Sequence, residues 1–144
     1  MAFDRHKTLQ ELEGMNWGEQ LFDSSLVSTA HRLYQKPLCE FTVEDLRLMI
    51  GQGIGLHFLV PLAIEKLEKN FLTYGDYHPG DLVRSVLTVE GDFWRTHQEL
   101  YWRVYELAVA LPSIMQDLIT TIESFCAESP SVEGGENHSE GRQR

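Results

Sequence analysis

The sequence has few cysteines and no recognisable export signal. Its 144 residues contain two cysteines, Cys39 and Cys126, which form no CxxC pair. No positively charged start leads into an apolar stretch with a cleavage site. We therefore expect both thiols to be reduced and the protein to be cytoplasmic.

Long apolar runs are also missing. The longest, residues 53–64, is interrupted by His57 and Pro61 and is shorter than the roughly 20 residues that a bilayer-spanning helix needs. We expect no membrane partner and no membrane-spanning segment.

Basic residues are scarce: 12 Lys and Arg stand against 22 Asp and Glu, which gives a formal net charge of −10 and a pI near 4.9. Such a charge repels nucleic acid and anionic membrane surfaces, and it attracts cationic partners. The sequence therefore predicts a basic protein as partner and excludes nucleic acid. The segment 128–144 carries four acidic and two basic residues, so a net charge of −8 remains on residues 1–127.

Apolar residues recur at spacings of three and four, and no segment alternates for long as a half-buried strand does. This pattern predicts an all-α protein, a single compact domain of about five to seven helices over residues 1–127. Capping signals place helices after Thr8, after Asp23 or Ser24, and after Thr42, the last over residues 43–50. Residues 128–144 are rich in Ser, Gly and Glu, and we expect them to form a flexible, disordered acidic tail.

Three glycines alternate at Gly51, Gly53 and Gly55. A phosphate-binding loop would need a preceding strand and a basic or acidic partner residue, and neither is predicted here. We therefore interpret Gly51 as a left-handed helix cap. The other two glycines would let the chain turn and two helices approach each other closely.

Several motifs resemble those of the contact-dependent growth inhibition (CDI) immunity proteins, over roughly residues 8–95. They are LQELEG at 9–14 with WG at 17–18, KPL at 36–38, FTVEDLRLMIGQ at 41–52, LVPLA at 59–63 and GDYHPGDL at 75–82. The resemblance implies a small cytosolic bacterial protein that binds the toxic C-terminal domain of a surface-delivered toxin and blocks it, with no catalytic residue. We expect no cofactor and no metal. We expect a monomer that binds one toxin domain.

Candidate partner-binding residues lie in the turn-rich segment 73–81 and at the start of the 43–50 helix. They are Tyr74, Asp76, Tyr77, Asp81, Glu44 and Asp45. Exposed tyrosines flanked by carboxylates suit a tight interface with a basic protein, such as a nuclease toxin. The alternative is structural: the aspartates would cap the next helix, the tyrosines would cover the core, and Glu44 and Asp45 would stabilise a helix start.

Two other classes of function compete. A metal-dependent enzyme could use His57, Asp76, His78, Asp81 and His97, but these residues form no HExxH or other closely spaced ligand set. We therefore expect no enzyme, and we interpret His97 as a partly buried, hydrogen-bonded side chain. An acidic protein-interaction or oligomeric scaffold protein without a toxin partner remains open, since the apolar helix after Pro112 could form a dimer seam.

Overall fold

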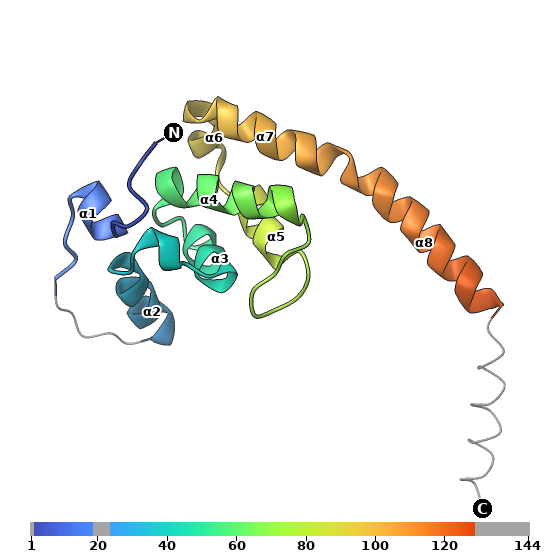
Figure 1. Cartoon of the computed structure of the whole chain (residues 1–144), viewed down its shortest axis with the longest axis horizontal. Coiled ribbons are helices and arrows are strands. Elements are labelled where there is room, and N and C mark those ends of the chain that lie inside the picture. Colours follow the sequence, from blue (N-terminus) through green and yellow to red (C-terminus); the bar gives the residue numbers. More distant parts are fainter. Residues whose placement is uncertain (1, 19–23, 129–144) are drawn as a thin grey trace, which may run out of the picture. The chain divides into compact units, whose positions relative to one another are not determined.

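The computed structural model describes residues 2–18 and 24–128, which form helices joined by turns and loops (Figure 1). The helices are α1 (Leu9–Glu13), α2 (Ser25–Tyr34), a 3₁₀ helix η1 (Leu38–Glu40), α3 (Val43–Gly51), α4 (Leu56–Lys69), α5 (Asp81–Leu87), α6 (Gly91–Thr96), α7 (Gln98–Val109) and α8 (Leu111–Ala127). Within the described ranges no strand is present, so the predicted all-α class is confirmed. The described ranges contain the helices α1–α8, of which α6 and α7 are separated only by a break at His97.

The chain divides into two compact units, Met1–Tyr105 and Glu106–Arg144. The predicted boundary at residue 127 stays a prediction, and all but Glu128 of the predicted tail lies outside the described residues.

Local capping determines where the first helices begin. Thr8 and Thr42 each accept a hydrogen bond from the backbone N–H three residues later, and the acidic residue there, Glu11 or Asp45, accepts one in return. Both starts are therefore capping boxes; the sequence predicts a helix start at each threonine. Ser24 caps α2 in the same position without the reciprocal bond.

The core of the first unit forms where α3 packs against α2, α4 and α5, and α3, α4 and α5 lie side by side in Figure 1. Apolar side chains from these helices and α1 are almost fully buried; among them are Leu9, Leu33, Leu46, Met49, Leu59, Ile64, Leu67, Leu82 and Val86. Pro61 lies inside α4, which continues through it although proline cannot donate to the carbonyl four residues earlier.

The turn between α3 and α4 corrects the prediction for Gly51. The left-handed residue is Gly53 (φ 73°), whose N–H donates to the Ile50 carbonyl, while the Ile54 N–H donates to the Met49 carbonyl. These two bonds form a Schellman motif, which requires the left-handed residue just beyond the helix cap. The helix continues through Gly51, so the prediction of a left-handed cap there is wrong.

Close approach explains one of the three glycines, Gly55. A Cβ on Gly51 would lie 3.8 Å from Ser85 Oγ, which is an ordinary contact where α3 meets α5. A Cβ on Gly55 (φ 65°) would lie 2.7 Å from a methyl carbon of Leu9. Only Gly55 is therefore required both by its backbone conformation and by the space around it.

Candidate functional site

The loop between α4 and α5 is held in place by a buried carboxylate. Asp81 is 4% exposed, and its two oxygens accept the N–H of Gly75 at 2.8 and 3.1 Å and that of Tyr77 at 3.2 Å. Because ionised acceptors make the stronger hydrogen bonds, this one side chain fixes both ends of the 75–77 segment. Asp81 is therefore a buried anchor of the loop, and it exposes little surface to a partner.

A second carboxylate fixes the loop from α3. Glu44 Oε1 accepts the N–H of Asp76 at 2.9 Å, and both Glu44 oxygens accept from the Arg47 guanidinium. A Cβ on Gly75 would lie 2.8 Å from the Glu44 Cα, so the loop reaches this helix only with glycine at that position. The bonds from Arg47 hold the pKa of Glu44 below its ordinary value, since they stabilise the ionised carboxylate.

The outer side of the loop is aromatic and acidic. Tyr74 and Tyr77 are 56% and 69% exposed, and Asp76 is exposed between them. The Arg47 guanidinium lies 4.3 Å from the centre of the Tyr77 ring. This cation–π contact helps to hold the ring in place. We call the residues Tyr74, Asp76, Tyr77, Glu44 and Arg47 the Tyr77 surface.

A surface groove adjoins the Tyr77 surface. It has a volume of about 420 Å³ and is lined by Ser25, Leu26, Thr29, Glu44, Arg47, Leu48, Gly51, Gln52 and Tyr77. Leu26 is 41% exposed there. The groove thus offers apolar contact area next to charged groups and an exposed ring.

The structure separates the six predicted site residues into two groups. Four of them, Glu44, Asp76, Tyr77 and Asp81, are joined by the hydrogen bonds of the loop, and Tyr74 lies beside them. Asp45 belongs to the helix start: it completes the capping box and accepts a 2.7 Å bond from the Lys36 ammonium.

The structural alternative is also partly corrected. Asp81 is the first residue of α5, whose N-cap is Gly80, so Asp81 orders the loop and does not cap the helix. The exposure of Tyr74 and Tyr77 shows that these rings do not cover the core.

The histidine and aspartate set of the enzyme hypothesis is not assembled. His57 Nδ1 lies 2.9 Å from His97 Nε2, but Asp81 is engaged with the loop and His78 Nδ1 contacts the Pro79 carbonyl. Among residues 2–18 and 24–128, no group of three or more His, Cys, Asp or Glu side chains could hold a metal ion. His97 is half-buried, stacked on Phe93 and hydrogen-bonded, as predicted.

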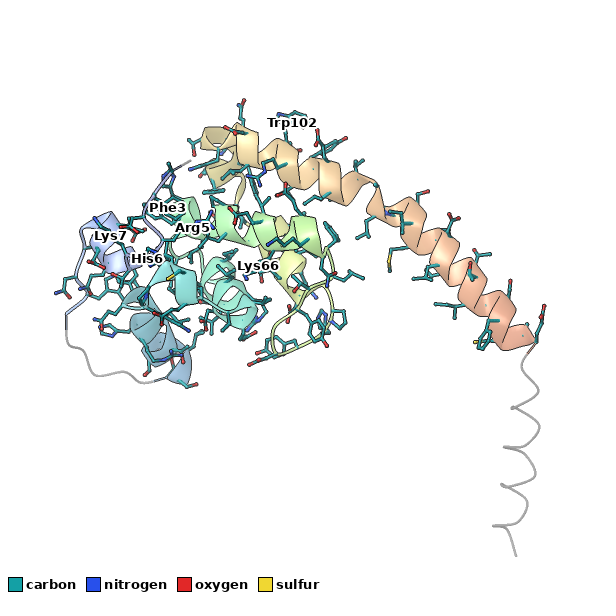
Figure 2. All side chains as sticks on the ribbon, in the orientation of Figure 1. Phe3, Arg5, His6, Lys7, Lys66 and Trp102 are labelled. Carbon is teal, nitrogen blue, oxygen red and sulfur yellow. The ribbon has the colours of Figure 1, made fainter. Side chains whose placement is uncertain are left out.

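Sequence reasoning missed an exposed aromatic group on α6 and α7. Trp94, Tyr101 and Trp102 line a shallow surface hollow of about 300 Å³. Trp102, which Figure 2 labels, is 55% exposed. The eight-residue spacing of the two tryptophans indicates a shared face. It does not reveal that the break at His97 puts them on separate helices.

A basic group lies near the start of the chain. Figure 2 labels Phe3, Arg5, His6 and Lys7 on the N-terminal segment and Lys66 on α4. Arg5 is already neutralised by a bidentate ion pair with Glu65, which raises the pKa of Arg5 and lowers that of Glu65. This part of the surface therefore has a weaker positive field than its composition suggests.

Residues 11–104 match the family model for CDI immunity proteins, which is more than half of the chain. The chain belongs to this family. The match covers most of the span over which the sequence motifs resemble such proteins. It contains all six predicted site residues and ends one residue before the first compact unit does. No curated protein and no solved structure matches the chain.

Membership of the CDI immunity family gives the protein a toxin-neutralising immunity role with a CDI toxin as its partner. Immunity proteins of this kind act by binding and are in general not enzymes. In the part of the chain that the structure describes, no helix is long and apolar enough to cross a membrane.

Proposed function

We propose that this immunity protein acts in the cytoplasm, where it binds the basic C-terminal nuclease domain of its cognate CDI toxin. Each chain binds one toxin domain, and the Tyr77 surface with its groove forms the centre of the contact. The observation that carries the proposal is the family match over residues 11–104. The geometry of the Tyr77 surface supports the choice of contact.

The loop is ordered before any partner arrives. Asp81 and Glu44 together accept the N–H groups of Gly75, Asp76 and Tyr77. Association therefore loses little backbone entropy at this position, and preordering of this kind favours tight binding. Exposed tyrosines in a fixed orientation are the residues that most often dominate interface energies.

The negative charge of the chain favours a basic partner, and an exposed carboxylate lies on the Tyr77 surface. The net charge of −10 raises the rate of encounter with a basic domain. Asp76 is exposed between the tyrosines, where it can meet a basic side chain at the edge of a nuclease cleft. Glu44 forms an ion pair with Arg47, so it fixes the shape of the loop but adds little unpaired negative charge to the surface.

The test uses the C-terminal domain of the cognate CDI toxin. Binding kinetics are measured for the unaltered chain and for Tyr77→Ala, Asp76→Lys and the control Trp102→Ala, which removes an exposed ring from α7. Tyr77→Ala should raise Kd about 30-fold, chiefly through faster dissociation. Asp76→Lys should slow association about tenfold at low salt and much less at high salt.

The outcomes separate the function from its location. If the unaltered chain does not bind the toxin domain or protect cells from it, the proposed function is wrong. If the chain binds but Trp102→Ala is the damaging change and Tyr77→Ala is silent, the function stands and the contact lies on α7.

A further inference from the structure

Helix α8 differs from every other long helix because none of its residues is buried. Leu111, Met115, Leu118, Ile122 and Phe125 follow one another at spacings of four, three, four and three residues. Their exposures include 52% for Leu118, 51% for Ile122 and 74% for Phe125. Ile114 and Ile119 flank this row and are 59% and 44% exposed. The result is a wide, unpartnered apolar face.

The spacing is that of a heptad repeat. Met115 and Ile122 occupy a positions, and Leu111, Leu118 and Phe125 occupy d positions, which form the seam of a coiled coil. Ile114 and Ile119 then fall at g and e, which widens the seam. An a/d repeat with apolar flanks is the pattern by which one helix packs along another.

The charges of α8 lie away from this seam. Its two charged residues, Asp117 and Glu123, fall at c and b positions, and residues 104–128 contain no Lys or Arg. Two identical copies of the helix can therefore pair without facing like charges. The missing basic residues also argue against an anionic lipid surface, which selects helices with Lys and Arg on the polar face.

The buried apolar residues of the described ranges include none from α8. Every buried apolar residue of the described chain lies at or before Val104, which is also where the family match ends. Helix α8 thus follows a core that is already complete.

We propose that α8 is a self-association helix, and that its Leu111 to Phe125 face pairs with the same face in a second copy of this chain. The 17 residues of α8 extend over about 25 Å. Side chains of this size at about half exposure offer roughly 600 Å² per chain, or about 1,200 Å² per pair, the lower limit for a stable interface. The dimer replaces the monomer expected from the sequence and still binds one toxin domain per chain.

Sedimentation equilibrium of the full 144-residue chain between about 1 and 200 μM tests this proposal without any toxin. We expect the mass to rise with concentration from 16.6 kDa toward twice that value. The double variant Leu118→Ala/Ile122→Ala should raise the dimer dissociation constant at least 30-fold, and alanine preserves helix propensity. The control Thr120→Ala lies at an outer f position and should change it by less than threefold.

Two results would overturn the proposal. One is a mass of 16.6 kDa at every concentration, and the other is a dimer that the double variant leaves intact. In the first case, two further measurements show what the α8 face does instead. A monomer whose melting temperature falls in the double variant assigns the face to the chain's own fold. Sedimentation of a monomer with neutral phosphatidylcholine vesicles, lost in the double variant, assigns it to a bilayer.

Discussion

Replacing Asp81 by asparagine should destabilise the protein far more than the same change at Asp76. Asp81 is 4% exposed and accepts three N–H contacts from Gly75 and Tyr77, whereas Asp76 is exposed. Asparagine keeps one acceptor oxygen but turns an NH₂ group toward a backbone donor. The loss of charge-assisted bonds and one unpaired donor together cost about 2 kcal/mol. Asp76→Asn should cost less than about 0.5 kcal/mol.

Thermal and urea denaturation, followed by circular dichroism, measure this difference. For a chain of this size, 2 kcal/mol corresponds to a fall in Tm of roughly 5–10 °C. Asp76→Asn provides the matched control because the chemical change is identical and only the burial differs. Equal melting temperatures for the two variants would refute the argument that Asp81 anchors the loop.

Three further predictions follow from single residues. Gly53→Ala should cost about 1 kcal/mol in unfolding experiments because Gly53 is left-handed (φ 73°), whereas Gly51→Ala should be neutral or slightly stabilising; equal effects would contradict the Schellman assignment. Tyr34 is 1% exposed, and burial together with its bond to Glu13 raises its pKa to about 12. The protonated phenol therefore stabilises the fold fully below pH 10, and about 2 kcal/mol of the free energy of unfolding should be lost between pH 10 and 12. Tyr34→Phe should remove this loss. An unchanged dependence of stability on pH in the variant would contradict the assignment. Glu44 has a lowered pKa, so its contribution to stability is present above about pH 4.5 and is lost as the pH falls. In urea unfolding experiments at a series of pH values, Glu44→Gln should make the free energy of unfolding fall less steeply at acid pH. An equally steep fall would count against the pairing with Arg47.

The sequence predicts helices best where a local signal is sufficient. The capping boxes at Thr8 and Thr42 and the apolar spacing of α4 involve residues within one or two turns of each other, so they predict starts and buried faces correctly. The error at Gly51 has a local cause as well. Three alternate glycines allow the helix to end at any of them, and only the register of the last turn selects Gly53.

The candidate site depends on contacts that sequence alone does not give. The segment 73–81 is recognisable as a loop from its turn residues, but the bond from Asp76 to Glu44 joins positions 32 residues apart. Burial of Asp81 depends on where the loop folds over α5, which no local pattern determines. The residue types therefore indicated the segment as a candidate, while the division into anchoring and exposed members required the fold.

The most direct test of the central claim is co-purification of this chain with the C-terminal domain of its cognate CDI toxin, combined with a growth assay in cells that produce that domain. We predict a stable complex with one toxin domain per chain, and growth that depends on this protein. Separate elution of the two proteins, with no rescue of growth, would contradict the account.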